Sequence, residues 1–410
     1  MLTCAIVGYG NRGSIYADLL GEMENVRIAC VCDSNEKNLR AAQKKFALSD
    51  ADCFSSDMEF FKAKRADCAV IATMDKLHAA HAVEALGLGY DILLEKPIAT
   101  TPEDCDKIEA AAIRSGRKVL VCHVLRYTSF FRKIKELLST GKLGEITSVS
   151  ESENVAFVHY WLSFLHGNWN NSEESSPIIL QKCCHDFDIL SWLLDRRCER
   201  VSSFGNLFVY KKKNAPEGAA AYCCDCRLAD ECLYSGLRIM KKDPYWLKGY
   251  YEDMELSDEG VENVLSDRTN VFSRCAFSGR NNVMTDQIVN MWYEGGIPVQ
   301  HLMSGFSADG RREITIHAAR GEIYGYMGAE EVKVHYRPFQ EPETVFDLTE
   351  KSAESGHGGG DRGIIRSFVS YLETGEKSDY LSVLSDSLMS HRIAFAAEES
   401  RRCGGKLIVL

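Results

Sequence analysis

The chain has 410 residues, of which 45% are hydrophobic, and carries a formal net charge of −11 with a pI near 5.6. This length is sufficient for two domains, each with its own core, and the composition is that of a globular protein. Nucleic-acid and anionic-membrane binding depend on clustered Lys and Arg, which the acidic balance argues against, so we expect a small-molecule ligand.

The first residues, MLTCAIVGYG, show no basic region and no processing site, and a short apolar run leads directly into glycines. No later segment approaches the roughly 18 apolar residues of a membrane span. Most of the sixteen cysteines lie singly in apolar runs, where thiols act as small hydrophobes in a reducing compartment. We therefore expect a cytoplasmic protein with no membrane or nucleic-acid partner.

Up to residue 123, short β-branched runs alternate with helical patterns. The strand candidates cover residues 4–10, 27–33, 67–73, 91–97 and 118–124. Helical patterns lie between them, and the last begins with Thr101 as N-cap and Pro102 at the first helical position. Residues 1–123 are therefore predicted to form a Rossmann domain, an α/β doubly wound parallel sheet.

The pattern changes after a helix predicted over residues 129–141. Longer strands follow over residues 145–157, 286–305, 312–327 and 331–337, with Gly295, Gly296 and Gly321 at expected hairpin turns. Residues 124–410 are predicted to form an α+β domain with a large, mostly antiparallel open sheet, and its C-terminal helix could pack back on the first domain. Such a sheet can pack against a copy of itself, which favours a homodimer or homotetramer.

A glycine-rich loop connects the first strand to the first helix. Gly8 permits the tight turn, Gly10 lets backbone approach a pyrophosphate, and Gly13 allows the helix to pack on the strand. Asp33 ends the second strand, where a carboxylate accepts ribose hydroxyls and repels a 2′-phosphate, so NAD is favoured over NADP. Other residues expected at the cofactor are Asn11, Arg12, Thr73, His78, Glu95 and Lys96.

Two alternatives to this cofactor site remain open. The glycines could serve only the strand-to-helix turn while Asp33 caps the next helix. Arg12 could also offer its charge to the extra phosphate of NADP.

The strand that ends in ILLEKP places Lys96 at the carboxyl edge of the sheet, where open α/β folds bind ligands. Pro97 keeps Lys96 out of helical geometry and so fixes its direction. An ordinary strand end at the surface is the alternative.

The stretch QKCCHDFDIL reads as part of one apolar helix. Gln181, His185 and Asp188 fall on one face of it at spacings of four and three residues. Apolar side chains occupy almost every other direction, so this polar stripe is expected to line a cleft.

The glycine fingerprint, the EKP triplet, the junction VCHVLRYTSFFRKIKELLSTGKLGEI and the histidine-bearing helix resemble the glucose-fructose oxidoreductase, inositol dehydrogenase and MocA (Gfo/Idh/MocA) family over nearly the whole chain. The resemblance implies that Lys96 and His185 face the nicotinamide and the substrate hydroxyl. Oxidation of an alcohol needs a base for the O–H proton and a cation for the developing alkoxide. His185 suits the first role and Lys96 the second, although Lys96 could itself be the base.

One residue departs from the family pattern. Many relatives have an aspartate where this chain has Gln181, and an amide can orient a ligand but cannot accept a proton. Lys182 and Asp186 are neighbours that the pattern lacks, and Asp188 is a candidate to orient His185. A buried core histidine is the alternative role for His185.

Further residues are expected to shape the substrate pocket. The segment HYWLSFLHGNWN supplies aromatic and hydrogen-bonding groups suited to a sugar ring, with core packing as the equal alternative. His357 could reach the site, although Asp361 as the N-cap of the next helix would explain that segment. The residues predicted to bind substrate are Gln181, Lys182, Asp188, Arg126, Tyr127, His159 and Trp169.

A cysteine cluster is the last motif. Cys223 and Cys226 form a CxxC pair, Cys232 follows, and Cys275 is a candidate fourth ligand. Thiolates at this spacing can share one tetrahedral zinc ion. Free thiols are the alternative, because a disulfide would conflict with a reducing compartment.

These observations predict an NAD-dependent oxidoreductase acting on a secondary hydroxyl of a sugar, sugar derivative or cyclitol, with Lys96 and His185 at the reaction centre. One alternative is a redox-neutral glycosidase that uses the same cofactor. It would transiently oxidise a sugar hydroxyl, eliminate the aglycone, add water and reduce the sugar again. The other is a non-catalytic sensor of NAD(H) or a sugar, favoured only by Gln181.

Overall fold

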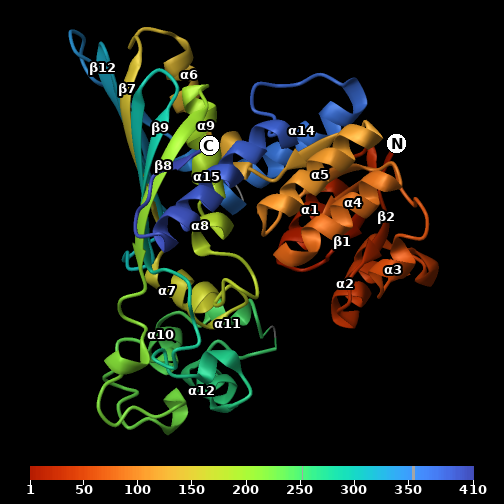
Figure 1. Cartoon of the computed structure of the whole chain (residues 1–410). Helices are drawn as coiled ribbons and strands as arrows, with labels where there is room; N and C mark the ends of the chain where they lie inside the picture. The colour runs from red at the N-terminus through yellow and green to blue at the C-terminus, as the bar shows by residue number, and fades with distance from the viewer. Residues whose placement is uncertain (252, 353–355) are drawn as a thin grey trace.

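Two sheets dominate the computed structural model, which describes residues 1–251, 253–352 and 356–410 (Figure 1). The first is a six-stranded parallel sheet in the order β3-β2-β1-β4-β5-β6. Its strands are β1 (Leu2–Val7), β2 (Val26–Cys32), β3 (Cys53–Phe54), β4 (Cys68–Ile71), β5 (Asp91–Leu94) and β6 (Val119–Val121). Its helices are α1 (Asn11–Gly21), α2 (Glu36–Phe46), η1 (Asp50–Asp52), α3 (Asp57–Phe60), η2 (Asp75–Leu77), α4 (His78–Gly87) and α5 (Pro102–Ser115). The predicted doubly wound sheet is confirmed.

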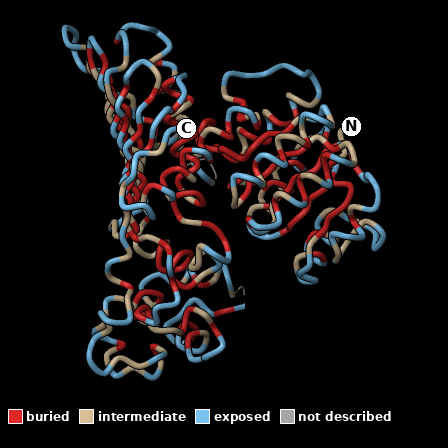
Figure 2. The backbone as a smooth tube through the Cα atoms, in the orientation of Figure 1, coloured by how far each residue is buried: buried red, intermediate tan, exposed pale blue. Residues whose placement is uncertain are grey.

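Local sequence rules account for these elements. Apart from the short edge strand β3, most strand residues are buried, as the continuous apolar runs predict for a parallel sheet covered by helices (Figure 2). Thr101 caps α5 by accepting a hydrogen bond from the Asp104 N–H at 3.2 Å, and Pro102 is the first helical residue. The short β3 and α3 carry too few residues for a periodic pattern.

The second sheet has nine strands in the order β14-β13-β12-β11-β7-β10-β9-β8-β15. Only its β7–β10 pair is parallel, so the predicted mostly antiparallel sheet is also confirmed. The strands are β7 (Ile146–Asn154), β8 (Cys198–Asn206), β9 (Asp286–Tyr293), β10 (Ile297–Ser304), β11 (Arg311–Ala318), β12 (Gly321–Met327), β13 (Val332–Pro338), β14 (Thr344–Asp347) and β15 (Ile408–Val409).

One predicted turn glycine has a different role. Gly295 and Gly296 turn the β9–β10 hairpin with φ of +84° and +83°, as expected. Gly321 instead begins β12, and a Cβ there would lie 2.5 Å from the Arg337 carbonyl oxygen. The close approach of β13, and not a turn, is what excludes a side chain at this position.

Helices connect the two sheets and cover one side of the second sheet (Figure 1). The longer ones are α6 (Ser129–Ser139), α9 (Cys184–Leu194), α12 (Asp258–Ser266), α14 (Gly360–Thr374) and α15 (Leu384–Arg402). The shorter ones are η3 (Val124–Tyr127), α7 (Phe157–Tyr160), η4 (Trp161–His166), α8 (Ile178–Gln181), η5 (Lys212–Asn214), η6 (Cys223–Asp225), α10 (Gly236–Lys242), α11 (Tyr245–Lys248), η7 (Val271–Ser273), α13 (Thr349–Ser352) and η8 (Gly356–Gly359).

The last two helices return to the first sheet. Ile364 and Phe368 of α14 belong to the core that contains β1 and α1. In α15, the His391 ring accepts a hydrogen bond from the Ile98 N–H at 2.7 Å. The C-terminal helix therefore packs back on the first domain, while the division between residues 123 and 124 stays a prediction. Within the described ranges we find no helix with both the length and the apolar character of a membrane span.

Candidate functional site

The glycine loop after β1 has the geometry of a dinucleotide site. Gly8 has a φ of +89°, and a Cβ there would lie 2.6 Å from the Ala72 carbonyl oxygen. A Cβ at Gly13 would lie 1.8 Å from the Gly8 carbonyl oxygen, whereas one at Gly10 would meet nothing within 4 Å. Gly8 and Gly13 thus permit the turn and the close packing, and Gly10 leaves space before the N-terminus of α1, so these residues fit a pyrophosphate.

Asp33 is held at the carboxyl end of β2. Its carboxylate accepts hydrogen bonds from the Tyr9 N–H at 2.6 Å and the Asn35 N–H at 2.7 Å. The alternative that Asp33 caps α2 is wrong, because Asn35 is the N-cap and accepts from the Lys37 N–H. The carboxylate is thereby fixed beside the glycine loop, where the adenosine ribose would lie.

Arg12 does not offer a free charge to a phosphate. Its guanidinium donates to Glu95 at 2.9 Å and to Asp361 at 2.6 Å, and also to the Tyr16 hydroxyl. Burial raises the pKa of Glu95, but Arg12 and Lys96 outweigh burial and lower it, so Glu95 is ionised. The charge that the alternative of NADP binding assigned to Arg12 is therefore engaged by Glu95 and Asp361 in this structure.

The prediction that Asp361 is the N-cap of the next helix is wrong. Gly359 is the N-cap of α14, and Asp361 lies in the first helical turn, where it accepts hydrogen bonds from Arg12. His357 lies 3.1 Å from the same carboxylate. The carboxylate links α14 to the start of α1.

His78 and Thr73 connect the loops after β4 and β5. The buried His78 ring lies 2.6 Å from the Pro97 carbonyl oxygen through Nδ1 and 2.9 Å from the Thr73 carbonyl oxygen through Nε2. Thr73 Oγ1 lies 3.1 Å from Nδ1 of His81. Both predicted cofactor residues therefore also brace the backbone that presents Lys96.

Lys96 reaches across to the second domain. Its peptide bond to Pro97 is cis, and Nζ donates a hydrogen bond to the Gln181 carbonyl oxygen at 3.0 Å. The prediction of one continuous helix through this stretch is wrong, because α8 ends at Gln181 and α9 begins at Cys184. The break leaves a C-terminal carbonyl oxygen without its helical partner, and Lys96 uses it. It is thus the backbone of Gln181, not its amide, that contacts Lys96.

His185 is buried in the first turn of α9 with no hydrogen-bond partner for Nδ1 among the described residues. Burial lowers its pKa well below the usual value, and the positive charge of Lys96 and the neighbouring His123, Arg312 and His357 add to the effect. The ring is therefore neutral at pH 7. A neutral imidazole with an unused nitrogen can accept a proton or a hydrogen bond.

Asp188 does not orient His185, contrary to expectation. Its carboxylate receives two hydrogen bonds of 2.7 Å from the Arg126 guanidinium, and both side chains are buried. Arg126 also donates to the Leu381 carbonyl oxygen at 3.2 Å. Tyr127 is buried against Gly363 of α14. These three predicted substrate residues are instead engaged in joining η3 to α9 and α14.

The aromatic segment before α8 divides between site and core. His159 is half-buried, and its ring stacks on Trp246 with centroids 6.1 Å apart. Burial lowers its pKa to about 3, with further contributions from Lys182 and Lys96, so His159 lies in the field of these lysines. Tyr160, Trp161 and His166 are buried in the main core.

Trp169 connects the two domains. Its indole N–H donates to the buried Asp75 carboxylate at 3.2 Å, and the Ser176 hydroxyl donates to the same group at 2.9 Å. Asp75 lies in η2, directly before the helix that carries His78. The first domain therefore holds the indole in place through its N–H.

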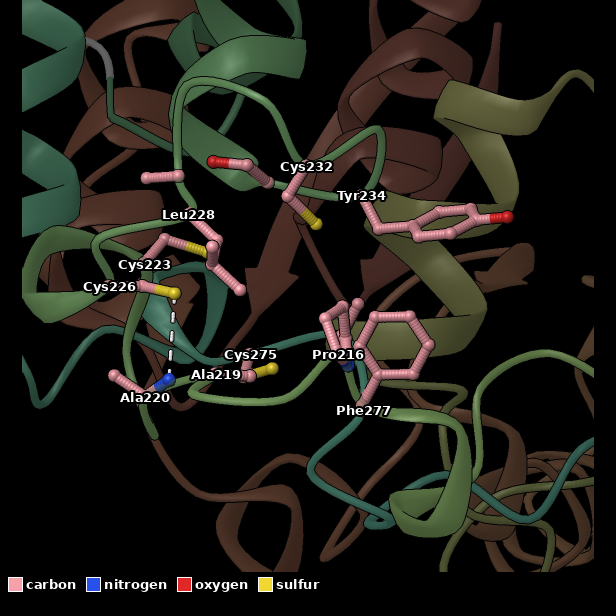
Figure 3. A pocket seen from close by; sticks show the side chains of 13 residues that line it. Pro216, Ala219, Ala220, Cys223, Cys226, Leu228, Cys232, Tyr234, Cys275 and Phe277 are labelled. Carbon is pink, nitrogen blue, oxygen red and sulfur yellow. Dashed lines mark hydrogen bonds between the residues drawn. The ribbon is translucent and has the colours of Figure 1, made fainter.

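The predicted zinc residues line one cavity in the segment between β8 and β9. Cys223, Cys226, Cys232 and Cys275 surround it together with apolar side chains (Figure 3). Each of the sixteen cysteines is a free thiol.

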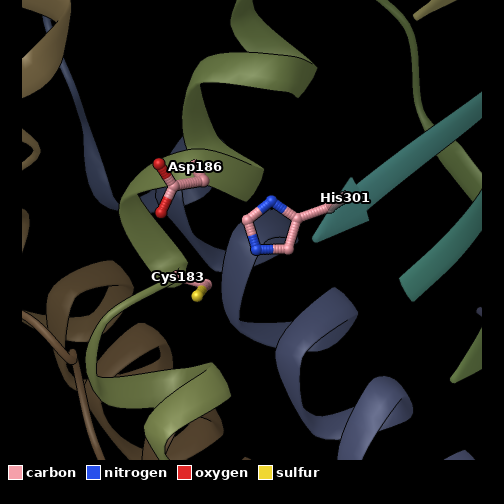
Figure 4. Close-up of side chains that lie close together, drawn as sticks. All are labelled: Cys183, Asp186 and His301. Carbon is pink, nitrogen blue, oxygen red and sulfur yellow. The ribbon is translucent and has the colours of Figure 1, made fainter. Parts of the chain in front are cut away.

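A buried ionic network lies behind α9. Arg312 of β11 contacts Glu153 and Asp186, each at 2.6 Å, and Lys182 lies 3.3 Å from Glu153. Cys183, Asp186 and His301 have ligand atoms within 4.8 Å of one another, the only such group of three among the described residues (Figure 4). Asp186 is already paired with Arg312, and His301 with Glu151. Ion pairing therefore explains this group without a metal.

Sequence reasoning missed several of these residues. His123 follows β6 and lies with its ring 5.6 Å from that of His185 and 6.0 Å from that of His391. The rule that selected Lys96, a polar residue after a parallel strand, would have selected His123 as well. Arg312 and Glu153 carried no local signal, because charged residues on alternating strands usually face solvent.

Comparison with known proteins identifies the relatives of this chain. Residues 2–123 match the family described as "Oxidoreductase family, NAD-binding Rossmann fold", and residues 135–409 match "Oxidoreductase family, C-terminal alpha/beta domain". The Bacillus subtilis protein YteT is 27% identical over 363 residues, which cover 82% of this chain and 80% of YteT.

Two further proteins are similar to this chain in part of the sequence or in fold. The 2,7-anhydro-N-acetylneuraminate hydratase of Escherichia coli is 26% identical over 207 residues, which cover 50% of this chain and 53% of the hydratase. The crystal structure of the WlbA dehydrogenase from Bordetella pertussis in complex with NADH and UDP-GlcNAcA shares the fold with a TM-score of 0.71 at 17% identity, covering 100% of this chain and 97% of WlbA. The chain belongs to the Gfo/Idh/MocA oxidoreductase family.

Proposed function

We propose that this Gfo/Idh/MocA protein uses NAD to oxidise a secondary hydroxyl, or reduce the corresponding ketone, of a sugar, sugar derivative or cyclitol. The observation that carries the proposal is the pairing of a positioned cation with a neutral base. Lys96 is held by the Gln181 carbonyl oxygen, and the buried His185 nearby has an unused Nδ1. Alcohol oxidation needs these two functions at one carbon.

The roles follow from charge and burial. Burial lowers the pKa of His185 and keeps its ring neutral at pH 7, and this unprotonated ring is the group that accepts the hydroxyl proton. The Lys96 ammonium stabilises the alkoxide that forms. Bound NAD would supply the hydride acceptor. Lys182 and Arg312 are paired with Glu153 and Asp186, so Lys96 is the cation on which the proposal relies.

NAD is the cofactor that the residues favour over NADP. The open space before Gly10 and the N-terminus of α1 suit the pyrophosphate. The Asp33 carboxylate would accept the ribose hydroxyls and repel a 2′-phosphate, and Arg12 is occupied by Glu95 and Asp361.

The test is turnover of a panel of sugars, sugar acids and cyclitols, followed by NADH absorbance. On a substrate so identified, Lys96→Ala and His185→Ala should each lower kcat about 10²- to 10⁴-fold, the usual contribution of acid–base and electrostatic groups. The exposed Lys107→Ala and His317→Ala are matched controls and should retain full activity. Full turnover by both site variants would contradict the assignment.

A second candidate function is a redox-neutral reaction in which a leaving group is eliminated and water is added between oxidation and reduction. Similarity to the E. coli hydratase favours it. Mass spectrometry of small molecules released on denaturation separates the two. Stoichiometric NAD(H) retained through purification, with no net NADH during turnover, favours the redox-neutral reaction, and reversible binding to an empty site favours a dehydrogenase.

A non-catalytic sensor is the remaining alternative. It would bind NAD(H) or a sugar without turning over any member of the panel. Intact Lys96 and His185 argue against it, since a sensor has no need of a proton acceptor beside a fixed cation.

The open face of the second sheet supports a homodimer or homotetramer. Phe204, Ile288 and Leu302 lie side by side on β8, β9 and β10, and all three are exposed. An apolar row of this kind is a typical interface core. Ile288→Asp is expected to lower the mass measured by light scattering, whereas Met58→Asp, at an exposed apolar position of the first domain, is the control.

A further inference from the structure

The segment between β8 and β9 has little regular structure to hold it. It consists of short helices, the longest being α12 (Asp258–Ser266) and α10 (Gly236–Lys242). Among its described residues, one β-bridge joins Tyr222 to Arg274, and the Arg268–Asp225 ion pair also connects its two halves. Short helices without a sheet are marginally stable alone, so such a segment gains most from a cross-link.

Four cysteines meet beside this bridge. Cys223 and Cys275 directly follow the two bridged residues, and the Cys275 N–H donates to the Ala221 carbonyl oxygen at 2.9 Å. Cys226 directly follows η6, Cys232 lies in the loop beyond it, and all four side chains line one cavity (Figure 3). The neighbouring Cys224 does not line it. The fold thus places the four cysteines that the CxxC spacing suggested around one cavity.

Backbone N–H groups are directed at the sulfurs. The Ala220 N–H donates to Cys226 Sγ at 3.5 Å. Backbone hydrogen bonds from Gly236 and Phe277 also reach Cys223 and Cys275. Donors around sulfur stabilise bound thiolates and orient them, which is the usual arrangement in the surroundings of a metal ligand.

We propose that Cys223, Cys226, Cys232 and Cys275 bind one structural zinc ion. Four thiolates at Zn–S distances of about 2.3 Å complete a tetrahedral, closed site, with sulfurs about 3.8 Å apart. No three of these sulfurs lie within 4.8 Å of one another, so binding draws the segments inward. Zinc binding displaces the thiol protons and involves no electron transfer.

The cross-link would hold Trp246 in place. Trp246 lies in α11, within this segment, and stacks on His159. A zinc ion that fixes the segment would therefore also help to fix the surroundings of His159, near Lys96 and Lys182. This consequence is structural and does not depend on the identity of the substrate.

The experiment is elemental analysis of the full chain purified under reducing conditions from zinc-supplemented medium. About one zinc per chain is expected. Cys226→Ser and Cys275→Ser should lose it, and the adjacent Cys224→Ser should retain it. Absence of zinc from the native chain, or equal retention in all three variants, would overturn the proposal.

A second measurement covers variants that do not fold. Native, reduced protein is stripped with a chelator and titrated with Co²⁺, which gives thiolate charge-transfer absorption in a tetrahedral sulfur site. Removal of the metal is expected to make residues 207–283 more sensitive to protease. Saturation at one Co²⁺ per chain that restores protease resistance supports the site. Absence of the thiolate absorption contradicts it.

Discussion

Removal of the Asp188 carboxylate is expected to destabilise the protein strongly. Asp188 and Arg126 are 1% and 4% exposed, and two hydrogen bonds of 2.7 Å join them. Asp188→Ala leaves the guanidinium buried without its partner, which costs about 3–5 kcal/mol. The ratio of folded to unfolded protein would fall between about 10²- and 10⁴-fold.

The pair also positions the candidate base. Asp188 lies three residues after His185 on α9, and Arg126 belongs to η3 at the junction of the domains. When the pair is lost, α9 loses its anchor on that junction. We therefore expect Asp188→Ala to lower kcat as well as the free energy of unfolding.

Urea unfolding followed by tryptophan fluorescence measures the stability change. Trp192 on α9 is a local probe, because the Arg126 guanidinium carbon lies 5.8 Å from its ring centroid. The double variant Arg126→Met with Asp188→Leu removes both charges and should recover most of the loss. Asp104→Ala, which breaks the exposed pair with Lys107, is the control and should cost at most about 1 kcal/mol.

Two outcomes would refute this reasoning. A cost below about 1 kcal/mol for Asp188→Ala would mean that the buried charge finds water or another partner. A double variant as unstable as the single one would mean that the apolar side chains do not fit the space, and that charge is not the cause.

Three further predictions concern the cofactor, acid stability and the domain contact. Asp33→Ala should weaken NAD binding about 10- to 100-fold, because hydrogen bonds to a charged group contribute about 1.5–3 kcal/mol. The affinity for NADP should not fall. Calorimetry that shows equal losses of affinity for both cofactors would contradict this prediction. Burial lowers the pKa of His166 and His391 to about 3, so both stay neutral when folded. In the unfolded chain both histidines protonate near pH 6.5. The free energy of unfolding should therefore be highest above pH 6.5 and should fall toward pH 3 by about 1.4 kcal/mol per pH unit for each histidine. Urea midpoints that do not change between pH 7.5 and 4.5 would refute this. Trp169→Phe removes the N–H donated to Asp75 and should cost about 1.5–3 kcal/mol in urea unfolding, while an unchanged midpoint would show that this contact does not stabilise the fold.

The sequence predicted the features that depend on neighbouring residues. Strand and helix alternation specified the parallel sheet, and Thr101 with Pro102 specified the start of α5. The roles of Gly8 and Gly13 follow from the absence of a side chain at a fixed spacing in the loop, and the structure shows the clashes that any Cβ would make. The family motif, the strand end and the helix face indicated Lys96 and His185 as candidate site residues.

The sequence could not predict which charges would pair. Arg12 pairs with Asp361, 349 residues away, and Lys96 with the backbone of Gln181. Many carboxylates and carbonyl oxygens were equally good partners by type, and periodicity says nothing about which of them the fold brings near. The sequence did not indicate the helix break at Lys182, because the residues on either side continue the apolar pattern.

The sequence by itself therefore determined the two sheets and the dinucleotide loop and indicated the candidate reactive groups, since these depend on local spacing and side-chain type. Only the tertiary structure decided that Asp188 pairs with Arg126, that His185 lies beside His123 and keeps a free nitrogen, and that four cysteines share one cavity. The physical reason is that burial and long-range pairing set charge states and partners, and both are properties of the packed chain.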